Sequence, residues 1–293
     1  EEGKGNGKSP MLAGIGIFLM VADGEPRAEI YAAAAKKEQA AVLFQDAVAM
    51  RDQSPSLSAR ISKQGENPVW QMTYLGKGGD KRFFKPIANE AKSGGQSGPR
   101  PHGALCDEVH EHPSRDTIEM LERGFKFRRQ PLLCMATNSG SDRKSICWEE
   151  HQHAVRVAAG IVDDDTTFAF VCALDEGDVW ETDPTCWVKA NPLLDETITT
   201  EFLAAQVKQA VQMPGKRNTI ARLHFCQWTQ STTAAIKREA WLACKGKVDV
   251  AAMVEAGYPC YGGLDLSKTR DFTALTLVWV LDNTKDAERF AAK

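Results

Sequence analysis

The amino-acid sequence predicts an α/β protein with a mostly parallel central sheet that is covered by helices. Short apolar segments alternate with helical segments in the first half of the chain, which is typical of parallel strands joined by crossover helices. Polar residues directly follow two of these apolar segments, at the position where open parallel sheets carry ligand chemistry. A glycine-rich stretch also leads straight into the first helical segment.

The first expected helix covers residues 8–21, because apolar residues from Met11 to Leu19 recur at helical spacing. The later elements, in chain order, are a strand at 28–34, a helix at 36–51, short strands at 58–62 and 69–75, a loop at 93–101, a strand at 104–106, a helix at 114–123, a strand at 132–136, a helix at 142–159 and a strand at 167–174. Residues 183–256 are expected to be mainly helical, with an extended stretch at 220–225. Two strands at 261–265 and 272–281 then begin a new unit.

Length and composition are those of a globular protein. At about 150 residues per domain, 293 residues suggest two domains, and 43% hydrophobic with 26% charged residues supports a sizeable core. These values exclude a disordered tail, a collagen-like fibre and a small disulfide-stapled module. The longest early apolar stretch, at 11–22, is shorter than the roughly 20 residues of a membrane helix, so we expect no membrane span.

Charge and cysteine content narrow the function further. The formal net charge is -3, from 36 basic and 39 acidic residues, which excludes coating of nucleic acid by bulk charge but not contact through a local patch. The cluster Lys81, Arg82 and Lys85 is either such a patch or solvated loop charge. The 8 cysteines show no C-x-x-C spacing, which predicts buried reduced thiols rather than a zinc ribbon.

The glycine-rich stretch GKGNGKS at residues 3–9 has the features of a phosphate-binding loop. Small residues let backbone amides surround an anion at a helix N-terminus, Lys8 would reach the outer phosphates, and Ser9 would bind Mg²⁺. The full pattern would have glycine at position 2, where this chain has Glu2, and the strand expected before the loop is not in the sequence. The alternative is a flexible glycine and lysine tail.

An acidic pair, Asp107 and Glu108, ends the apolar segment 104–106. About five adjacent acidic pairs are expected from composition alone, so the position of this pair carries the argument. At a strand end, Asp107 would hold water on Mg²⁺, and Glu108 would orient or deprotonate the attacking water. The alternative is a polar strand end followed by a solvated turn.

Thr137 and Asn138 end the next apolar segment. Short polar side chains there can contact a γ-phosphate or the attacking water, and can report its loss to neighbouring elements. Without further context an Asx-type turn explains this pair equally well.

Taken in order, the segments GKGNGKS, AEIYAAAAKKEQA, ALCDEVHEHP, MATNSG, RLHFCQW and GGLDLSKTRDFTAL resemble the large terminase subunit of tailed bacteriophages, the ATP-driven motor that packs DNA into proheads. The resemblance implies a P-loop ATPase of the additional-strand type at residues 1–195, a helical linker at 196–257 and the start of a ribonuclease-H-like nuclease at 258–293.

The resemblance also implies roles for individual residues. Nucleotide binding falls to Gly3, Gly5, Asn6, Gly7, Lys8, Ser9, Thr137 and Asn138. Mg²⁺ binding falls to Ser9 and Asp107, activation of water to Glu108, and the coupling of hydrolysis to DNA movement to the pair at 137–138. An arginine finger is expected as well. The arginine-finger candidates are Arg27, Arg115, Arg123 and Arg143.

The resemblance makes Asp265, on GGLDLS, the first nuclease carboxylate, and Asp271, close in sequence across the following turn, would support a Mg²⁺ or Mn²⁺ ion. Two-metal cleavage needs several clustered carboxylates. The remaining carboxylates of the family come from later strands, so we expect the nuclease to be incomplete here, and the chain to hydrolyse ATP weakly without cutting DNA alone.

The implied partners are double-stranded DNA, a terminase small subunit, a portal protein and further copies of the chain in a ring. The implied location is the cytoplasm of the bacterial host, transiently at the prohead portal, with no membrane. Two alternatives stay open: another nucleic-acid-directed P-loop ATPase of helicase type, and a non-catalytic prophage remnant that keeps the fold.

Overall fold

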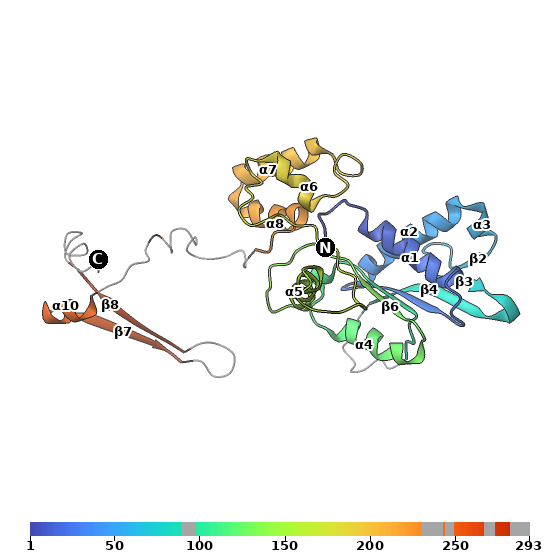
Figure 1. Ribbon diagram of the computed structural model, residues 1–293, viewed down its shortest axis with the longest axis horizontal. Coiled ribbons are helices and arrows are strands. Elements are labelled where there is room, and N and C mark those ends of the chain that lie inside the picture. The colour runs from blue at the N-terminus through green and yellow to red at the C-terminus, as the bar shows by residue number, and fades with distance from the viewer. Residues whose placement is uncertain (89–97, 230–242, 244–248, 267–272, 282–293) are drawn as a thin grey trace. The chain divides into compact units, whose positions relative to one another are not determined.

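The computed structural model describes residues 1–88, 98–229, 243, 249–266 and 273–281 (Figure 1). The chain divides into two compact units, residues 1–232 and residues 233–293. Asp271 lies outside the described residues.

A six-stranded sheet with the order β2-β3-β4-β1-β5-β6 forms the centre of the first unit. The strands are β1 (Glu29–Ala34), β2 (Ile61–Gln64), β3 (Gln71–Leu75), β4 (Lys81–Ala88), β5 (Gly103–Cys106) and β6 (Leu132–Met135). Strands β4, β1, β5 and β6 run parallel, while β2 and β3 add an antiparallel edge. The carboxyl ends of the four parallel strands therefore share one edge of the sheet.

Helices cover both faces of this sheet (Figure 1). The helices of this part are α1 (Lys8–Val21), α2 (Lys37–Gln53), α3 (Pro55–Ser58), α4 (Asp116–Gly124) and α5 (Ile146–Ala158). Short 3₁₀ turns lie between them: η1 (Lys77–Gly79), η2 (Val109–Glu111) and η3 (Phe125–Phe127). Side chains of a strand alternate between faces, so Ile30 packs with α1 and α2, and Tyr31 packs on the side of α4. Both faces of β1 are buried, which explains its apolar run.

Strand β4 was not expected, because its sequence KRFFKPIA reads as a basic cluster rather than an apolar strand. The two phenylalanines decide the outcome. Phe84 is fully buried on the side of α1 and α2, while its neighbour Phe83 packs with the cluster on the other face. The strand thus pairs with β1 through the register Glu29 to Phe83, with Lys81 and Arg82 before the paired residues and Lys85 among them.

A helical subdomain follows the sheet within the first unit. Its elements are η4 (Pro184–Cys186), α6 (Trp187–Ala190), α7 (Thr200–Gln212) and α8 (Pro214–Phe225), packed around Trp180, Leu203, Ile220 and Phe225. The extended stretch expected at 220–225 is wrong, because these residues end α8. Ile220, Ala221, His224 and Phe225 share a helical face at spacings of one and four, and this face is buried.

The strand expected at 167–174 is also absent. The segment instead meets the first residue of the chain: the amino group of Glu1 donates to the Phe170 carbonyl at 2.7 Å, and the Cys172 amide donates to the Glu1 carbonyl at 2.8 Å. The Glu2 amide donates to the Thr137 carbonyl just after β6 at 3.3 Å. Residues 1–2 therefore lie between the end of β6 and this segment, and two bonds to a single residue are too few for a strand ladder.

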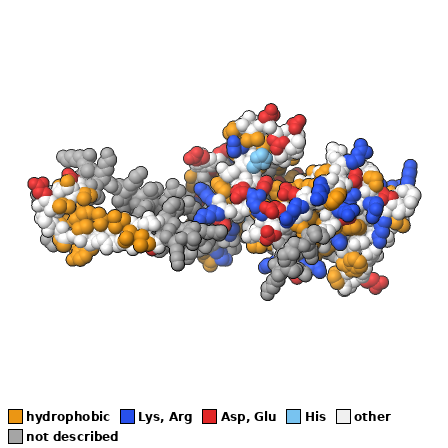
Figure 2. Space-filling model, turned by 90° about the horizontal axis from the view of Figure 1, so that it is seen from below, with side chains coloured by type: hydrophobic (Ala, Val, Ile, Leu, Met, Phe, Trp, Pro, Cys, Tyr) orange, Lys and Arg blue, Asp and Glu red, His pale blue; other side chains and the backbone are white. Residues whose placement is uncertain are grey.

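The second unit contains α10 (Val250–Glu255) and an antiparallel hairpin of β7 (Cys260–Asp265) and β8 (Ala274–Trp279). This confirms the two expected strands. Their apolar side chains, including those of Tyr261, Leu264 and Leu275, are exposed (Figure 2). Across the described part of the chain the cysteines are free, and no helix has the length and apolar character to cross a membrane.

Candidate functional site

The stretch at residues 3–9 forms a loop that turns directly into α1. Gly5 and Gly7 have φ angles of 98° and 81°, a left-handed conformation that side chains with a Cβ rarely adopt. In the described structure the amides of residues 5–9 donate to no acceptor. Free amides gathered at a helix N-terminus form a cradle for an anion such as a phosphate group.

The beginning of the loop is held by the helical subdomain. The Gly3 amide donates to the Ala190 carbonyl at 2.8 Å, and the Lys4 amide donates to the Leu223 carbonyl at 2.7 Å. A Cβ on Gly3 would lie 2.3 Å from Oδ1 of Asn191. Gly3 is therefore required for close packing, whereas Gly5 and Gly7 are required for backbone conformation.

Asn6 and Asn191 form a buried link between the loop and the helical subdomain. Nδ2 of Asn6 donates to Oδ1 of Asn191 at 2.9 Å, and the Leu193 amide donates to Oδ1 of Asn6 at 3.0 Å. Nδ2 of Asn191 in turn donates to the His224 carbonyl at 2.8 Å. The sequence did not predict a role for Asn191, because no spacing or motif distinguishes it from other helix-terminal asparagines.

Lys8 is 8% exposed, and its ammonium lies inside the loop. Nζ donates to the carbonyls of Glu2 at 2.9 Å and Gly3 at 3.1 Å. The loop thus holds its single buried cation directly beside the free amides, where a bound polyphosphate would meet both.

Ser9 meets Asp107 at the mouth of the loop. The Ser9 hydroxyl donates to Oδ2 of Asp107 at 2.6 Å, although 98 residues separate them in the sequence. Asp107 is 5% exposed, and its Oδ1 accepts from the Glu108 amide at 2.9 Å. A hydroxyl and a carboxylate beside an anion cradle are oxygen groups of the kind that would hold Mg²⁺ together with phosphate oxygens. The metal role of both residues stays a prediction.

Glu108 follows in a left-handed backbone conformation, with a φ angle of 49°. Burial, and then the charge of Asp107, raises the pKa of Glu108. Its Oε2 is buried without a hydrogen bond, 3.3 Å from Nδ1 of His110. A carboxylate oxygen without a partner in the described structure is available to accept a proton from water. Burial and the charge of Asp107 likewise raise the pKa of Asp46 on α2, a third acid that no motif in the sequence indicates.

His110 connects Glu108 to the end of β6. Its Nδ1 lies 3.2 Å from Oγ1 of Thr137, and its amide donates to the same oxygen at 3.0 Å. Burial lowers the pKa of His110, which keeps the ring neutral. His110 therefore contacts both Thr137 and the Glu108 carboxylate.

Asn138 is fully buried and ties three parts of the site together. Its Nδ2 donates to the Glu2 carbonyl at 2.8 Å and to the Leu223 carbonyl at 3.1 Å. The geometry therefore links the end of β6 to both the start of the loop and the end of α8.

Other expected site residues lie elsewhere. Asp265 lies in the second unit, on the exposed strand β7. Three of the arginine candidates already have partners: Arg115 pairs with Glu149, Nε of Arg123 donates to the Glu119 carbonyl, and the Arg143 guanidinium lies over the Trp148 ring. Arg27 follows the last residue of α1 by six positions and lies near Val21, at the end of the helix away from the loop. Arg222 was not among the arginine-finger candidates. Its charge contributes to lowering the pKa of His110, and its buried Nε has no hydrogen-bond partner among the described residues.

A family model described as "Terminase large subunit, ATPase domain" matches residues 1–156, more than half of the chain. The chain belongs to the terminase large subunit family. A second terminase model, "Terminase large subunit, endonuclease domain", matches residues 161–286. The resemblance found in the sequence is thereby confirmed.

Curated relatives agree with this assignment. The "Terminase, large subunit" of Enterobacteria phage HK97 is 25% identical over 288 residues, which cover 95% of this chain and 52% of the relative. "Protein YmfN" of Escherichia coli K12 is 29% identical over 182 residues, which cover 62% of this chain and 40% of the relative. The chain thus spans about half the length of the curated relatives it matches.

Solved terminase structures have the same fold. The large terminase of bacteriophage HK97 matches with a TM-score of 0.67 at 23% identity, over 97% of this chain and 56% of that one. A mutant ATPase domain of the Thermus phage P74-26 large terminase matches with a TM-score of 0.50 at 13% identity, over 78% of this chain and 86% of that one. The expected fold class is confirmed.

His224, next to the loop, makes the stability of the fold sensitive to acid. Burial, and then the charges of Lys4 and Lys8, lowers the pKa of His224 to about 4, from an ordinary 6.5. The unfolded chain therefore takes up a proton first as the pH falls, so stability is full above pH 6.5 and is lost toward pH 4.

We expect the free energy of unfolding to fall by about 3 kcal/mol more in the wild type than in His224→Gln between pH 7 and pH 4. Urea titrations of both proteins at three pH values measure this difference. The comparison cancels the other titrating groups that the two proteins share, and parallel losses in both proteins would contradict the assignment.

Proposed function

We propose that this chain hydrolyses ATP in a Mg²⁺-dependent reaction. The observation that carries the proposal is the 2.6 Å hydrogen bond from Ser9 to Asp107 beside the free amides of residues 5–9. It joins a hydroxyl, a carboxylate and an anion cradle, which is the set of groups that a magnesium triphosphate needs.

Each residue has one task in the proposed mechanism. The loop amides and Lys8 hold the phosphates and stabilise the charge that develops on them. Ser9 and Asp107 would hold Mg²⁺, which supplies further charge neutralisation when bound. Glu108 accepts a proton from the attacking water or orients it, aided by a raised pKa that suits a general base.

Thr137 and Asn138 carry the proposed coupling. Asn138 joins the loop start to α8, and Thr137 contacts His110 beside Glu108. Loss of the γ-phosphate near Lys8 would alter the Glu2 carbonyl contacts that Lys8 and Asn138 share. Hydrolysis is thereby linked to movement of the helical subdomain.

We further propose that the hydrolysis drives translocation of double-stranded DNA into proheads, in a ring of copies of this chain with a small subunit and a portal protein. The location would be the host cytoplasm and, transiently, the prohead portal. Membership of the terminase family and the similarity to the HK97 terminase support these assignments. The domain limits 1–195, 196–257 and 258–293 are part of the same proposal.

The test of the central proposal is release of inorganic phosphate from ATP by the purified chain, with and without Mg²⁺, beside a titration with a fluorescent ATP analogue. Mg²⁺-dependent release supports it. Absence of nucleotide binding at millimolar concentration would favour the non-catalytic alternative.

We expect no cleavage of plasmid DNA by this chain alone. The described residues hold no cluster of three or more side chains of the type that bind metals, and Asp265 is exposed on its hairpin. Two-metal cleavage needs more than one such carboxylate. Incubation with supercoiled plasmid and Mn²⁺, followed by gel electrophoresis, measures this. Robust cleavage that Asp265→Ala abolishes would contradict the expectation.

A further inference from the structure

A basic hollow of about 690 Å³ lies far from the candidate nucleotide site. Val21, at the end of α1, lines it, whereas the loop lies at the beginning of α1. A helix of 14 residues rises about 20 Å, so the two sites are separated by about that distance. Lys81 begins β4 and Asp107 follows β5, so the hollow lies at the amino edge of the parallel strands and the nucleotide site at the carboxyl edge.

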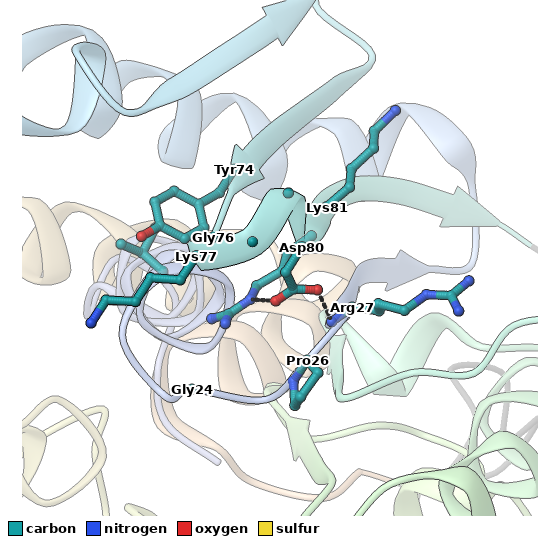
Figure 3. A pocket seen from close by; sticks show the side chains of 12 residues that line it. Gly24, Pro26, Arg27, Tyr74, Gly76, Lys77, Asp80 and Lys81 are labelled. Atoms are coloured by element: carbon teal, nitrogen blue, oxygen red, sulfur yellow. Dashed lines mark hydrogen bonds and ion pairs between the residues drawn. The ribbon is translucent and has the colours of Figure 1, made fainter.

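The hollow is built by two loops that Asp80 fastens together (Figure 3). Oδ1 of Asp80 accepts from the Arg27 amide at 2.6 Å, and Oδ2 accepts from Nε of Arg82 at 2.8 Å. The Gly76 amide closes the second loop by donating to the Asp80 carbonyl at 2.7 Å. Arg27 is held with a φ angle of 53°, a conformation that costs energy for an arginine and is often found at functional positions.

Charge in the hollow is strongly unbalanced. Asp80 is occupied by Arg82 and by a backbone amide, and the charge of Arg27 also acts on it, while the side chains of Lys77 and Lys81 have no partner in the described structure. Nearby acids are also occupied, since Glu25 and Glu29 both pair with Arg128. Four cations, Arg27, Lys77, Lys81 and Arg82, thus line the hollow with the single carboxylate of Asp80, on a chain whose net charge is -3.

Two glycines stand between Lys77 and Lys81 in the chain, so no side chain rises from the backbone there. Gly78 and Gly79 have φ angles of 72° and 80°, and a Cβ on either would meet nothing within 4 Å. Packing therefore does not require glycine at these two positions. The backbone here is open to close approach by a ligand.

The directions of the side chains decide which anion fits. In Figure 3, Arg27, Lys77 and Lys81 point outward in different directions from the centre at Asp80 rather than converging on one point. A single small anion would need convergent donors. Phosphates spaced along a polymer suit cations that fan out from one rigid turn.

We propose that this hollow binds the phosphodiester backbone of double-stranded DNA through Arg27, Lys77 and Lys81. The proposal deepens the proposed function and rests on it, since DNA as the substrate is part of that function. Because α1 joins this hollow to the nucleotide loop, a change at one end of the helix can be passed to DNA at the other end.

The test is the triple variant Arg27→Ala, Lys77→Ala and Lys81→Ala, with binding of a fluorescent duplex of about 30 base pairs measured by anisotropy over a range of salt concentrations. The control is the triple variant Arg60→Ala, Arg156→Ala and Lys208→Ala, which removes the same charge from exposed side chains. We expect the hollow variant to lose about tenfold in affinity at 0.1 M salt, and the slope of log K against log salt to become shallower by roughly 2.7. The control should keep both values close to those of the wild type.

Equal binding by the two triple variants would overturn the proposal. Extra binding of inorganic pyrophosphate by the wild type over the hollow variant, with equal duplex binding, would assign the hollow to a small anion and overturn it too. ATP binding by the same samples separates the two levels of inference. Normal ATP binding with unchanged DNA binding in the hollow variant rejects only the DNA site, whereas a wild type that binds no ATP contradicts the proposed function.

Discussion

Glu108→Gln is expected to keep binding of MgATP within about threefold of the wild type, while kcat for phosphate release falls by about 10² to 10³. Glutamine preserves the size of the side chain and a carbonyl oxygen, but it cannot accept a proton from water. The buried Oε2 has no hydrogen bond in the described structure, and the neighbouring Nδ1 of His110, 3.3 Å away, can still meet the amide group of glutamine. Loss of turnover without loss of binding is the signature of a group that acts in the transition state.

The matched control is Glu111→Gln, on the same short turn three residues later. Glu111 is exposed, accepts from Nε2 of Gln39 at 2.8 Å and lies 3.9 Å from His110. We expect its kcat to stay within about twofold of the wild type. Steady-state phosphate release and equilibrium titration with a fluorescent ATP analogue measure the two quantities, and an unchanged kcat in Glu108→Gln would remove Glu108 from its proposed role.

Lys8→Ala is expected to abolish measurable ATP binding at micromolar concentration and to lower kcat/KM by at least about 10²-fold. The ammonium is buried inside the loop, where the loop amides alone would have to hold several phosphate charges after its removal. A buried charge–phosphate contact is worth far more than an exposed one, because water screens it less.

Lys4→Ala is the control for this variant, since Lys4 lies in the same loop but is exposed and has no side-chain hydrogen bond in the described structure. It should change kcat/KM by only a few fold. Thermal unfolding of both variants checks that the loop still folds, because Lys8 also bonds to two loop carbonyls. Full ATP binding by a folded Lys8→Ala protein would contradict the phosphate site.

Local sequence predicted most elements of the sheet and its helices. The helix at 8–21 has the limits that its apolar spacing gave, and β1, β5 and β6 lie where apolar runs end in polar residues. These elements depend on periodicity and on residues close in the chain. The sequence did not predict β4, because packing between distant residues decides that strand. Its residues read as a basic loop until Phe83 and Phe84 are placed on opposite faces of the sheet.

The candidate site divides in the same way. The sequence by itself determined which residue types stand at the loop and at the strand ends, because glycine conformation and strand-end chemistry are local properties. Only the tertiary structure decided that Ser9 contacts Asp107, that Asn191 holds Asn6, and that the loop at 24–27 meets the turn at 76–82. Each of these contacts joins residues that lie dozens of positions apart or more. Their proximity follows from strand order and helix packing, for which no single segment of the chain carries a signal.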